Sequence, residues 1–256
     1  METDAFKGLS NVVPKGIEKE IQKVVFIGDI HGRTIWKKII DLEPDADRYI
    51  FFGDYFDPYD PIPFEVQAQN FRDILNLKAR LGERVVLLLG NHDYHYYADV
   101  RPYSRYDFRN AIAIKSLLIE NLRVFQIAYQ FGNVLCSHAG VSLTWLNTWF
   151  PVGWTWEGID KKINSLHYEK PQAFDYFVGD LSGYGDDERQ GPLWIRPSAF
   201  IDGVFVQFVG HTMDPKLNFG NKRLYLVDHL WQNAYLKFKK GQIEFSYIEF
   251  NATYRN

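Results

Sequence analysis

The sequence of 256 residues contains a single cysteine, Cys136. One thiol excludes an internal disulfide and a zinc cluster of thiolates, because both need further cysteines. No apolar run approaches the length of a membrane span, and residues 1–20 lack the apolar core of a signal peptide. The net charge of -3 gives no overall attraction to nucleic acid or to membranes. These absences predict a soluble, cytoplasmic protein.

Repeats, low-complexity tracts and polar linkers are absent as well. A chain of this length can bury the full core of one α/β unit. We therefore expect residues 1–256 to form a single domain.

The chain instead contains six short apolar runs, each of which ends at a residue able to bind a metal. Such runs, bounded by glycine and rich in β-branched residues, are typical of buried strands. The runs are 24–28, 49–53, 85–90, 134–137, 205–210 and 224–227, and they precede Asp29, Asp54, Asn91, His138, His211 and Asp228. Open α/β sheets place their sites where strands end. The first five endings together predict a metal centre, whereas Asp228 is interpreted as a structural hydrogen-bonding residue.

Helical patterns separate the first runs. Thr34 is a candidate N-cap for a short helix. Apolar residues from Phe64 to Leu75 recur at steps of four, three and four, which predicts a helix ending near Gly82. Another helical stretch covers about 108–120, and strand patterns dominate afterwards. This order predicts an α/β fold, a mixed β-sandwich of two packed sheets flanked by helices.

The region from about 142 to 203 shows neither pattern and holds five of the seven tryptophans. We expect it to be an irregular, cap-like insertion. Its tryptophans either form the apolar centre of that cap or line an aromatic rim for a nucleobase or peptide, and the first interpretation is favoured.

Five motifs follow the first five runs. They are Gly28-Asp29-Ile30-His31-Gly32, Gly53-Asp54-Tyr55-Phe56-Asp57, Gly90-Asn91-His92-Asp93, Ser137-His138-Ala139-Gly140 and Gly210-His211-Thr212. Asp29 and His31 lie two residues apart, so both point to one side of an extended segment. Oxygen and imidazole ligands without thiolate suit manganese, iron or zinc. With one bridging carboxylate, such a set holds two ions about 3.5–4 Å apart.

These motifs resemble the calcineurin-like metallophosphoesterase superfamily, and most closely its phosphoprotein (Ser/Thr) phosphatase branch of bacterial and phage type. The resemblance implies two divalent ions, with manganese favoured and iron or zinc also suitable. It implies that Asp29, His31 and Asp54 hold the first ion, and that Asp54 bridges to a second completed by Asn91, His138 and His211. His92 matches the general acid, and Asp57 matches the carboxylate that orients it. His95, in contrast, is interpreted as a surface or packing residue.

The chain departs from the family where an arginine normally grips the substrate phosphate after the second motif. Proline stands there, as Pro58, and proline provides no such donor. Arg196, in Trp194-Ile195-Arg196, resembles a second phosphate-binding arginine of the phage-type enzymes. Weaker candidates are Arg33 and three arginines after the third run, namely Arg101, Arg105 and Arg109.

The resemblance implies hydrolysis of phosphate monoesters by attack of a metal-bound hydroxide, as in a Ser/Thr protein phosphatase. The expected partner is a phosphorylated substrate, either a phosphoprotein or a nucleotide, and neither a membrane nor a long nucleic acid. Two alternatives stay open. One is a nucleotide or dinucleoside polyphosphate hydrolase or a nucleic-acid end phosphatase, and the other is a metal-binding scaffold without catalysis.

Overall fold

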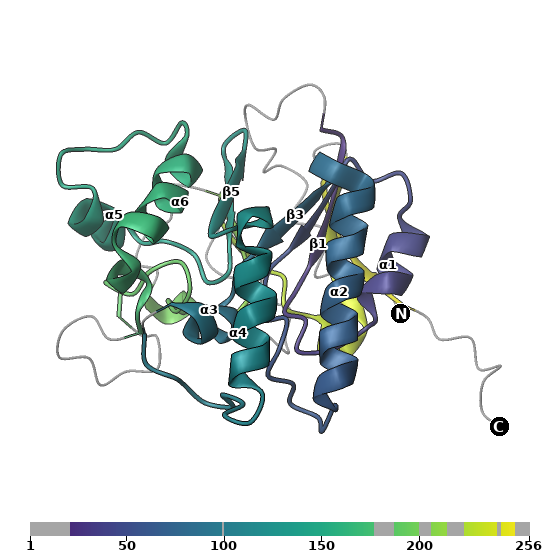
Figure 1. The fold of residues 1–256 in the computed structure, drawn as a ribbon. Coiled ribbons are helices and arrows are strands. Elements are labelled where there is room, and N and C mark those ends of the chain that lie inside the picture. Colours follow the sequence, from purple (N-terminus) through teal and green to yellow (C-terminus); the bar gives the residue numbers. More distant parts are fainter. Residues whose placement is uncertain are drawn as a thin grey trace, which may run out of the picture.

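The computed structural model describes residues 21–98, 100–176, 187–199, 206–213, 223–239 and 242–248. Within these ranges the strands form two sheets (Figure 1). The six-stranded sheet has the order β10-β9-β1-β2-β3-β4, and the four-stranded sheet has the order β5-β6-β7-β8. The strands are β1 Lys23–Ile27, β2 Arg48–Phe51, β3 Val85–Leu88, β4 Phe125–Gln126, β5 Ala128–Phe131, β6 Val134–Ser137, β7 Val206–Val209, β8 Leu224–Leu226, β9 Ala234–Lys239 and β10 Gln242–Tyr247.

The six predicted strands all form, and their directions bring their ends together. Strands β1 to β4 pair in parallel, and so do β6, β7 and β8. Strand β9 pairs antiparallel with β1 and β10, and β5 pairs antiparallel with β6. Parallel neighbours carry their carboxyl ends on the same edge of a sheet, so the residues after these strands share one rim.

Side chains of the central strands point alternately to the two faces of the six-stranded sheet, which explains why helices pack on one face and the second sheet on the other. Val25 and Phe51 face the helices and belong to one apolar core. Phe26 and Phe52, one residue further along, face the second sheet and belong to another core. The rings of Phe26 and Phe208 stack with centroids 4.1 Å apart and so join the two sheets. The predicted sandwich is confirmed.

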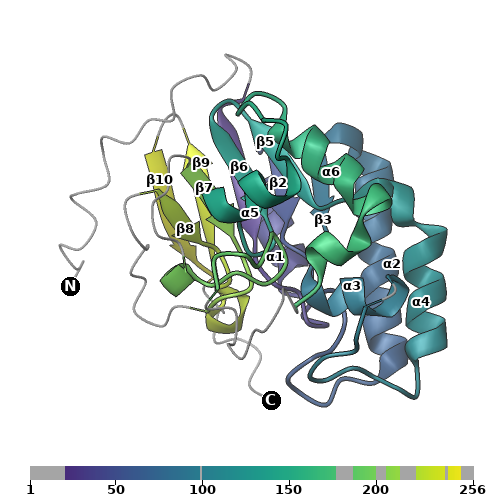
Figure 2. The same ribbon diagram turned by 90° about the vertical axis from the view of Figure 1, so that its left-hand side faces the viewer.

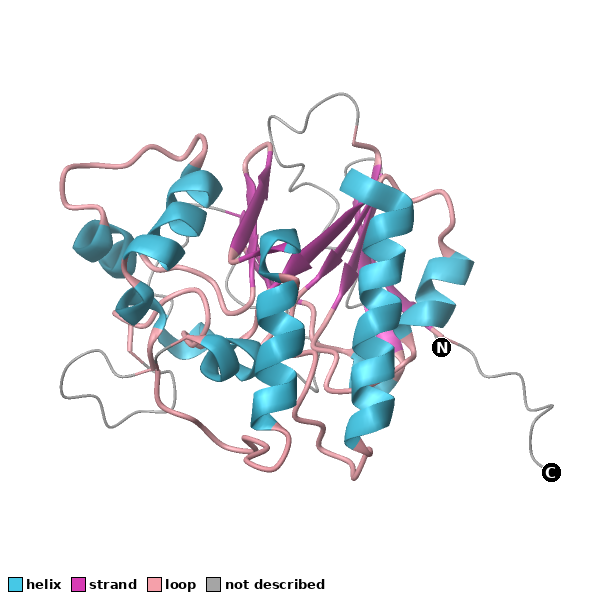
Figure 3. Cartoon of the chain, viewed as in Figure 1, coloured by secondary structure: helices cyan, strands magenta, loops and turns pink. Residues whose placement is uncertain are grey.

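The helices are α1 Trp36–Leu42, α2 Phe64–Leu81, α3 Asn91–Tyr97, α4 Ala111–Glu120, α5 Leu143–Trp149 and α6 Ile159–Glu169. The two helices α2 and α4 lie in front of the six-stranded sheet in Figures 1 and 3, whereas α5 and α6 lie to the side of it, next to β5. Helix α2 ends at Gly82 as predicted, but it buries Ile74 and Leu77 rather than Leu75, which is only half-buried. Thr34 does not cap α1, whose N-cap is Ile35. Within the described ranges no helix combines the length and apolar character that a bilayer crossing needs.

The cap-like segment is more regular than its sequence indicated, because it contains α5 and α6. Helix α6 buries Ile159, Ile163 and Leu166, at steps of four and three, and packs on β5 (Figure 2). Trp145 of α5 is fully buried and donates its indole N–H to the carbonyl of Ala173 at 3.0 Å. Trp145 thus forms part of an apolar centre, as predicted. Residues 177–186 and 200–203 of this segment lie outside the described ranges.

Candidate metal centre

The side chains predicted to bind metal gather at the shared rim of the two sheets. Asp29, His31 and Asp54 present ligand atoms that all lie within 4.8 Å of one another. One oxygen of Asp54, Oδ2, is 3.5 Å from Nε2 of His31 and 3.5 Å from Nε2 of His138. Asp54 therefore stands between the end of β1 and the end of β6.

The residues after β3 and β7 complete the group. The side-chain oxygen of Asn91 lies 2.8 Å from Nε2 of His138 and 3.1 Å from Nδ1 of His211. The backbone N–H of His211 donates to both carboxylate oxygens of Asp29 at 3.1 Å. The structure thus brings all six candidate ligands into one cluster.

Two of the histidines are oriented by their other ring nitrogen. His31 Nδ1 donates to the carbonyl of Phe56 at 3.0 Å, and His138 Nδ1 donates to the carbonyl of Phe52 at 2.6 Å. Each bond leaves the Nε2 lone pair directed at Asp54, which is the arrangement typical of metal-ligating histidines. In His211, Nε2 is buried without a hydrogen-bond partner. The lone pairs of these ring nitrogens fit a pair of divalent ions.

The electrostatics of the cluster also favour a cation. Burial, followed by the neighbouring charges of Asp228 and Asp54, raises the pKa of the Asp29 carboxyl well above its usual value. Burial and then Asp93 raise the pKa of Asp54 in the same way. Burial lowers the pKa of His138 to about 3, so its imidazole is neutral. Closely spaced carboxylates and neutral imidazoles are the states that bind metal, and a bound cation relieves the repulsion between the carboxylates.

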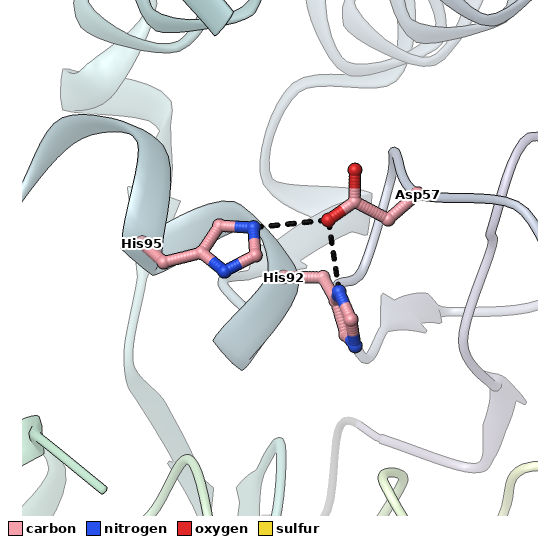
Figure 4. A group of neighbouring side chains, drawn as sticks. All are labelled: Asp57, His92 and His95. Carbon is pink, nitrogen blue, oxygen red and sulfur yellow. Dashed lines mark hydrogen bonds and ion pairs between the residues drawn. The ribbon is translucent and has the colours of Figure 1, made fainter. Parts of the chain in front are cut away.

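Next to this cluster, Asp57 accepts hydrogen bonds from three side chains of helix α3. His92 Nδ1 and His95 Nε2 each lie 2.9 Å from the same oxygen, Oδ2 (Figure 4). The hydroxyl of Tyr96 donates to the other oxygen. Burial raises the pKa of Asp57, but the hydrogen bonds from His92 and His95 outweigh it and hold the pKa below its usual value.

The donors around His95 define its tautomer. Its Nδ1 accepts the backbone N–H of Tyr103 at 3.3 Å, so its Nε2 carries the hydrogen donated to Asp57. Although Asp57, His92 and His95 are spaced closely enough for a metal, these hydrogen bonds occupy the nitrogen and oxygen atoms that would bind it. The group is a hydrogen-bond network that orients His92. His95 is buried and hydrogen-bonded to Asp57, so its interpretation as a surface or packing residue was wrong.

Asp93 is a structural residue of the site whose role sequence reasoning missed. Its carboxylate accepts the backbone N–H groups of Gly90, Asp54 and Tyr55 at 2.7–2.9 Å. It therefore ties the segment after β2 to the start of α3. The signal was present, because an acidic residue three positions after a helix N-cap commonly bonds back to it.

Arginines and aromatic rings surround the cluster. The charge of Arg33 acts on Asp29, and that of Arg196 acts on His138 and His211. The ring of Tyr59 packs edge-on against His31 at 4.9 Å between centroids, and Trp194 packs on His211 at 5.8 Å. The charges of Arg33 and Arg196 therefore reach the candidate metal ligands, and their role in phosphate binding stays a prediction.

Asp228 also belongs to this neighbourhood. It is buried after β8, and its carboxylate accepts the backbone N–H of Asp29, in agreement with a structural hydrogen-bonding role. Its Oδ1 has no hydrogen-bond partner, and burial raises its pKa to about 7. Asp228 thus adds a carboxyl group directly behind Asp29.

The chain is similar to known proteins in sequence and in fold. The model of the calcineurin-like phosphoesterase family matches residues 22–215. A cold-active protein-tyrosine phosphatase of the psychrophile Shewanella sp. is 19% identical, with 88% of this chain and 80% of that chain covered and a TM-score of 0.55. A protein serine/threonine phosphatase from Saccharomyces cerevisiae is 14% identical, with 91% and 82% covered and a TM-score of 0.49. No curated protein matches the sequence.

The two-sheet sandwich and the rim of acids and histidines define a metal-dependent phosphoesterase. The chain belongs to the calcineurin-like phosphoesterase family, because that family's model covers most of it. It is accordingly a metal-dependent phosphoric ester hydrolase, and the family implies a dinuclear centre of divalent ions.

Proposed function

We propose that the chain hydrolyses phosphate monoesters in the manner of a Ser/Thr protein phosphatase. Two divalent ions would be held by the candidate ligands, the first by Asp29, His31 and Asp54, and the second by Asp54, Asn91, His138 and His211. The observation that carries the proposal is the convergence of these side chains beside a buried His92–Asp57 pair. Manganese is favoured, and iron or zinc suit the same nitrogen and oxygen donors.

Each part of the reaction has a candidate group. When bound, the two ions lower the pKa of water and neutralise charge on the phosphoryl oxygens. Arg196 and Arg33 add positive charge for the substrate phosphate. His92, whose Nδ1–H is held by Asp57 at 2.9 Å, takes up a proton from solvent at Nε2 and gives that proton to the leaving alkoxide. Asp57 keeps the ring oriented during that transfer.

We further propose that the whole chain acts as one catalytic domain. Trp145 and Ile163 of the cap-like segment belong to the same apolar core as Val25 and Phe51 of the central strands. A segment that shares the core of the sheets folds with them, so the cap-like segment forms part of the catalytic unit.

The substrate class has a specific alternative. Tyr59 is 52% exposed beside His31, and Trp194 lies against His211, so two aromatic rings flank the cluster. Such rings stack on nucleobases, which favours a nucleotide or dinucleoside polyphosphate or a nucleic-acid end. They also pack on phosphopeptide side chains, and the Shewanella relative is named a protein-tyrosine phosphatase. We favour the phosphopeptide.

The test is phosphate release by manganese-loaded protein from an aryl phosphate monoester and from the matching diester. We expect monoester turnover in the wild type and loss of both turnover and metal in Asp54→Asn. His92→Ala should keep its metal content while turnover falls by about a hundredfold or more. Preference for the diester would favour the nucleotide alternative. Two bound ions without turnover of either compound would favour the scaffold.

A further inference from the structure

Arg105 reaches the site from the segment that joins α3 to α4. One terminal nitrogen, Nη2, donates to Nε2 of His92 at 3.0 Å, and Nε donates to the backbone carbonyl of Asp57 at 3.3 Å. The guanidinium carbon lies 3.7 Å from the centroid of the Tyr59 ring. These three contacts hold the planar group directly beside the candidate general acid.

None of these contacts neutralises the charge of Arg105. An imidazole, a backbone carbonyl and an aromatic face are its partners, and across the described ranges no carboxylate lies within ion-pair distance of it. A guanidinium offers five N–H donors; His92, the Asp57 carbonyl and the Tyr59 side chain use three of them, which leaves two. The side chain is also exposed to solvent. An uncompensated charge with free donors next to a metal centre fits an anionic ligand.

The backbone of Arg105 gives independent support. In the described ranges six residues other than glycine have a positive φ, namely His31, Asp54, Asp57, Arg105, His211 and Asn233. Asparagine tolerates this conformation, and four of the others are candidate site residues. Arg105, at φ 62°, costs about 1–2 kcal/mol and thus shares a strain that clusters at functional positions.

We propose that Arg105 binds the phosphoryl oxygens of the substrate, supported by stacking on Tyr59. The fork geometry allows two parallel hydrogen bonds to a phosphate, and the flat ring below fixes its plane. Pro58, which precedes the ring in sequence, has no side-chain donor for this role. As Arg105 turns to the phosphate it leaves Nε2 of His92, so that nitrogen becomes free to take up the proton that it gives to the leaving group. This inference rests on the proposed phosphate-ester substrate.

The test is equilibrium binding of inorganic phosphate to the manganese-loaded protein by calorimetry. Arg105→Gln should weaken phosphate binding about ten- to hundredfold, the loss expected for charge-assisted hydrogen bonds, with metal content unchanged. Arg105→Lys should recover only part of the loss, because it restores the charge without the fork. The matched control is Arg72→Gln, an exposed arginine of helix α2 with no part in the proposed site, which should bind phosphate like the wild type.

Two further variants separate binding from structure. Arg105→Gly removes the strain at φ 62° and should keep or raise the melting temperature while phosphate binding falls. Tyr59→Leu should weaken phosphate binding in the wild type but have little further effect in Arg105→Gln, whereas Tyr59→Phe should retain it. The non-additivity identifies Tyr59 as a positioning residue that acts through Arg105.

Unchanged phosphate affinity in Arg105→Gln would overturn the inference, and so would loss of its metal. Aryl phosphate turnover, measured in parallel, separates this failure from failure of the proposed function. If the wild type turns over the aryl phosphate and Arg105→Gln changes neither phosphate affinity nor KM, the proposed role of Arg105 is refuted and the proposed function stands. If phosphate binding depends on Arg105 but the protein turns over no aryl phosphate, the role of Arg105 in phosphate binding is supported and the proposed hydrolysis is refuted.

Discussion

Replacing Gly90 by alanine should displace the carboxylate of Asp54 without straining the backbone. Gly90 has φ -99°, a value that alanine adopts freely. A Cβ added at Gly90, however, would lie 2.0 Å from Oδ1 of Asp54 and 2.6 Å from its backbone nitrogen. A rotation of the side chain relieves only the first contact, because the backbone nitrogen is held by Asp93 at 2.7 Å. The segment that carries Asp54 must therefore move.

The size of that movement follows from the contacts. Bringing the carboxylate oxygen from 2.0 Å to a tolerable separation of 3.0 Å moves it by roughly 1 Å, and functional sites lose their geometry beyond about 0.5 Å. The other oxygen of this carboxylate, Oδ2, faces His31 and His138 across the candidate metal site. We expect metal affinity to fall about ten- to hundredfold. The unfolding free energy of the metal-free protein should fall by about 1–3 kcal/mol through overpacking.

The assay is competition for manganese against a chromogenic chelator, with urea unfolding measured in excess chelator. Gly82→Ala is the control, because Gly82 has φ 57° but nothing lies within 4 Å of its added Cβ. It should lose about 1 kcal/mol of stability through strain alone and bind metal normally. If Gly90→Ala binds two ions as tightly as the wild type, the packing of Gly90 does not position Asp54.

Three further changes test other parts of the structure. Asp93→Ala should lower the unfolding free energy by about 2–4 kcal/mol in urea, because three buried backbone N–H groups lose their acceptor; a change below about 0.5 kcal/mol would show that water replaces it. His95→Ala removes one donor to Asp57 and should reduce kcat about tenfold at unchanged metal content, with recovery in His95→Gln; equal activity of all three proteins would contradict the network. Burial raises the pKa of Glu43, but hydrogen bonds, first from Lys23, hold it below its usual value. This stabilisation is present above about pH 4.3, the unfolded value, and lost as the pH falls through the folded pKa, so Glu43→Gln should flatten that acid limb in melting curves.

Much of the fold was predictable because local patterns carry it. The runs from Val24 and Val85 are apolar on consecutive residues, as strands covered on both faces must be, and both form strands. Helix α2 carries a 3.6-residue pattern over five turns and ends at a glycine. Helix α3, with seven residues, is too short for such a pattern, and all its residues except the half-buried Tyr97 are buried. It was therefore missed, and with it the role of His95.

The sequence by itself determined the fold class and the positions after each strand that can bind a metal, because strand ends and glycine turns are local properties. Tertiary structure alone decided how those positions are used. Arg105 donates to the carbonyl of Asp57 from 48 residues away in the sequence. Asp93, which follows β3, accepts the backbone N–H of Asp54, which follows β2. Such contacts depend on how the connections between strands fold back over the rim, and no local pattern records that path. The group beside His92 therefore became visible only once the chain was folded.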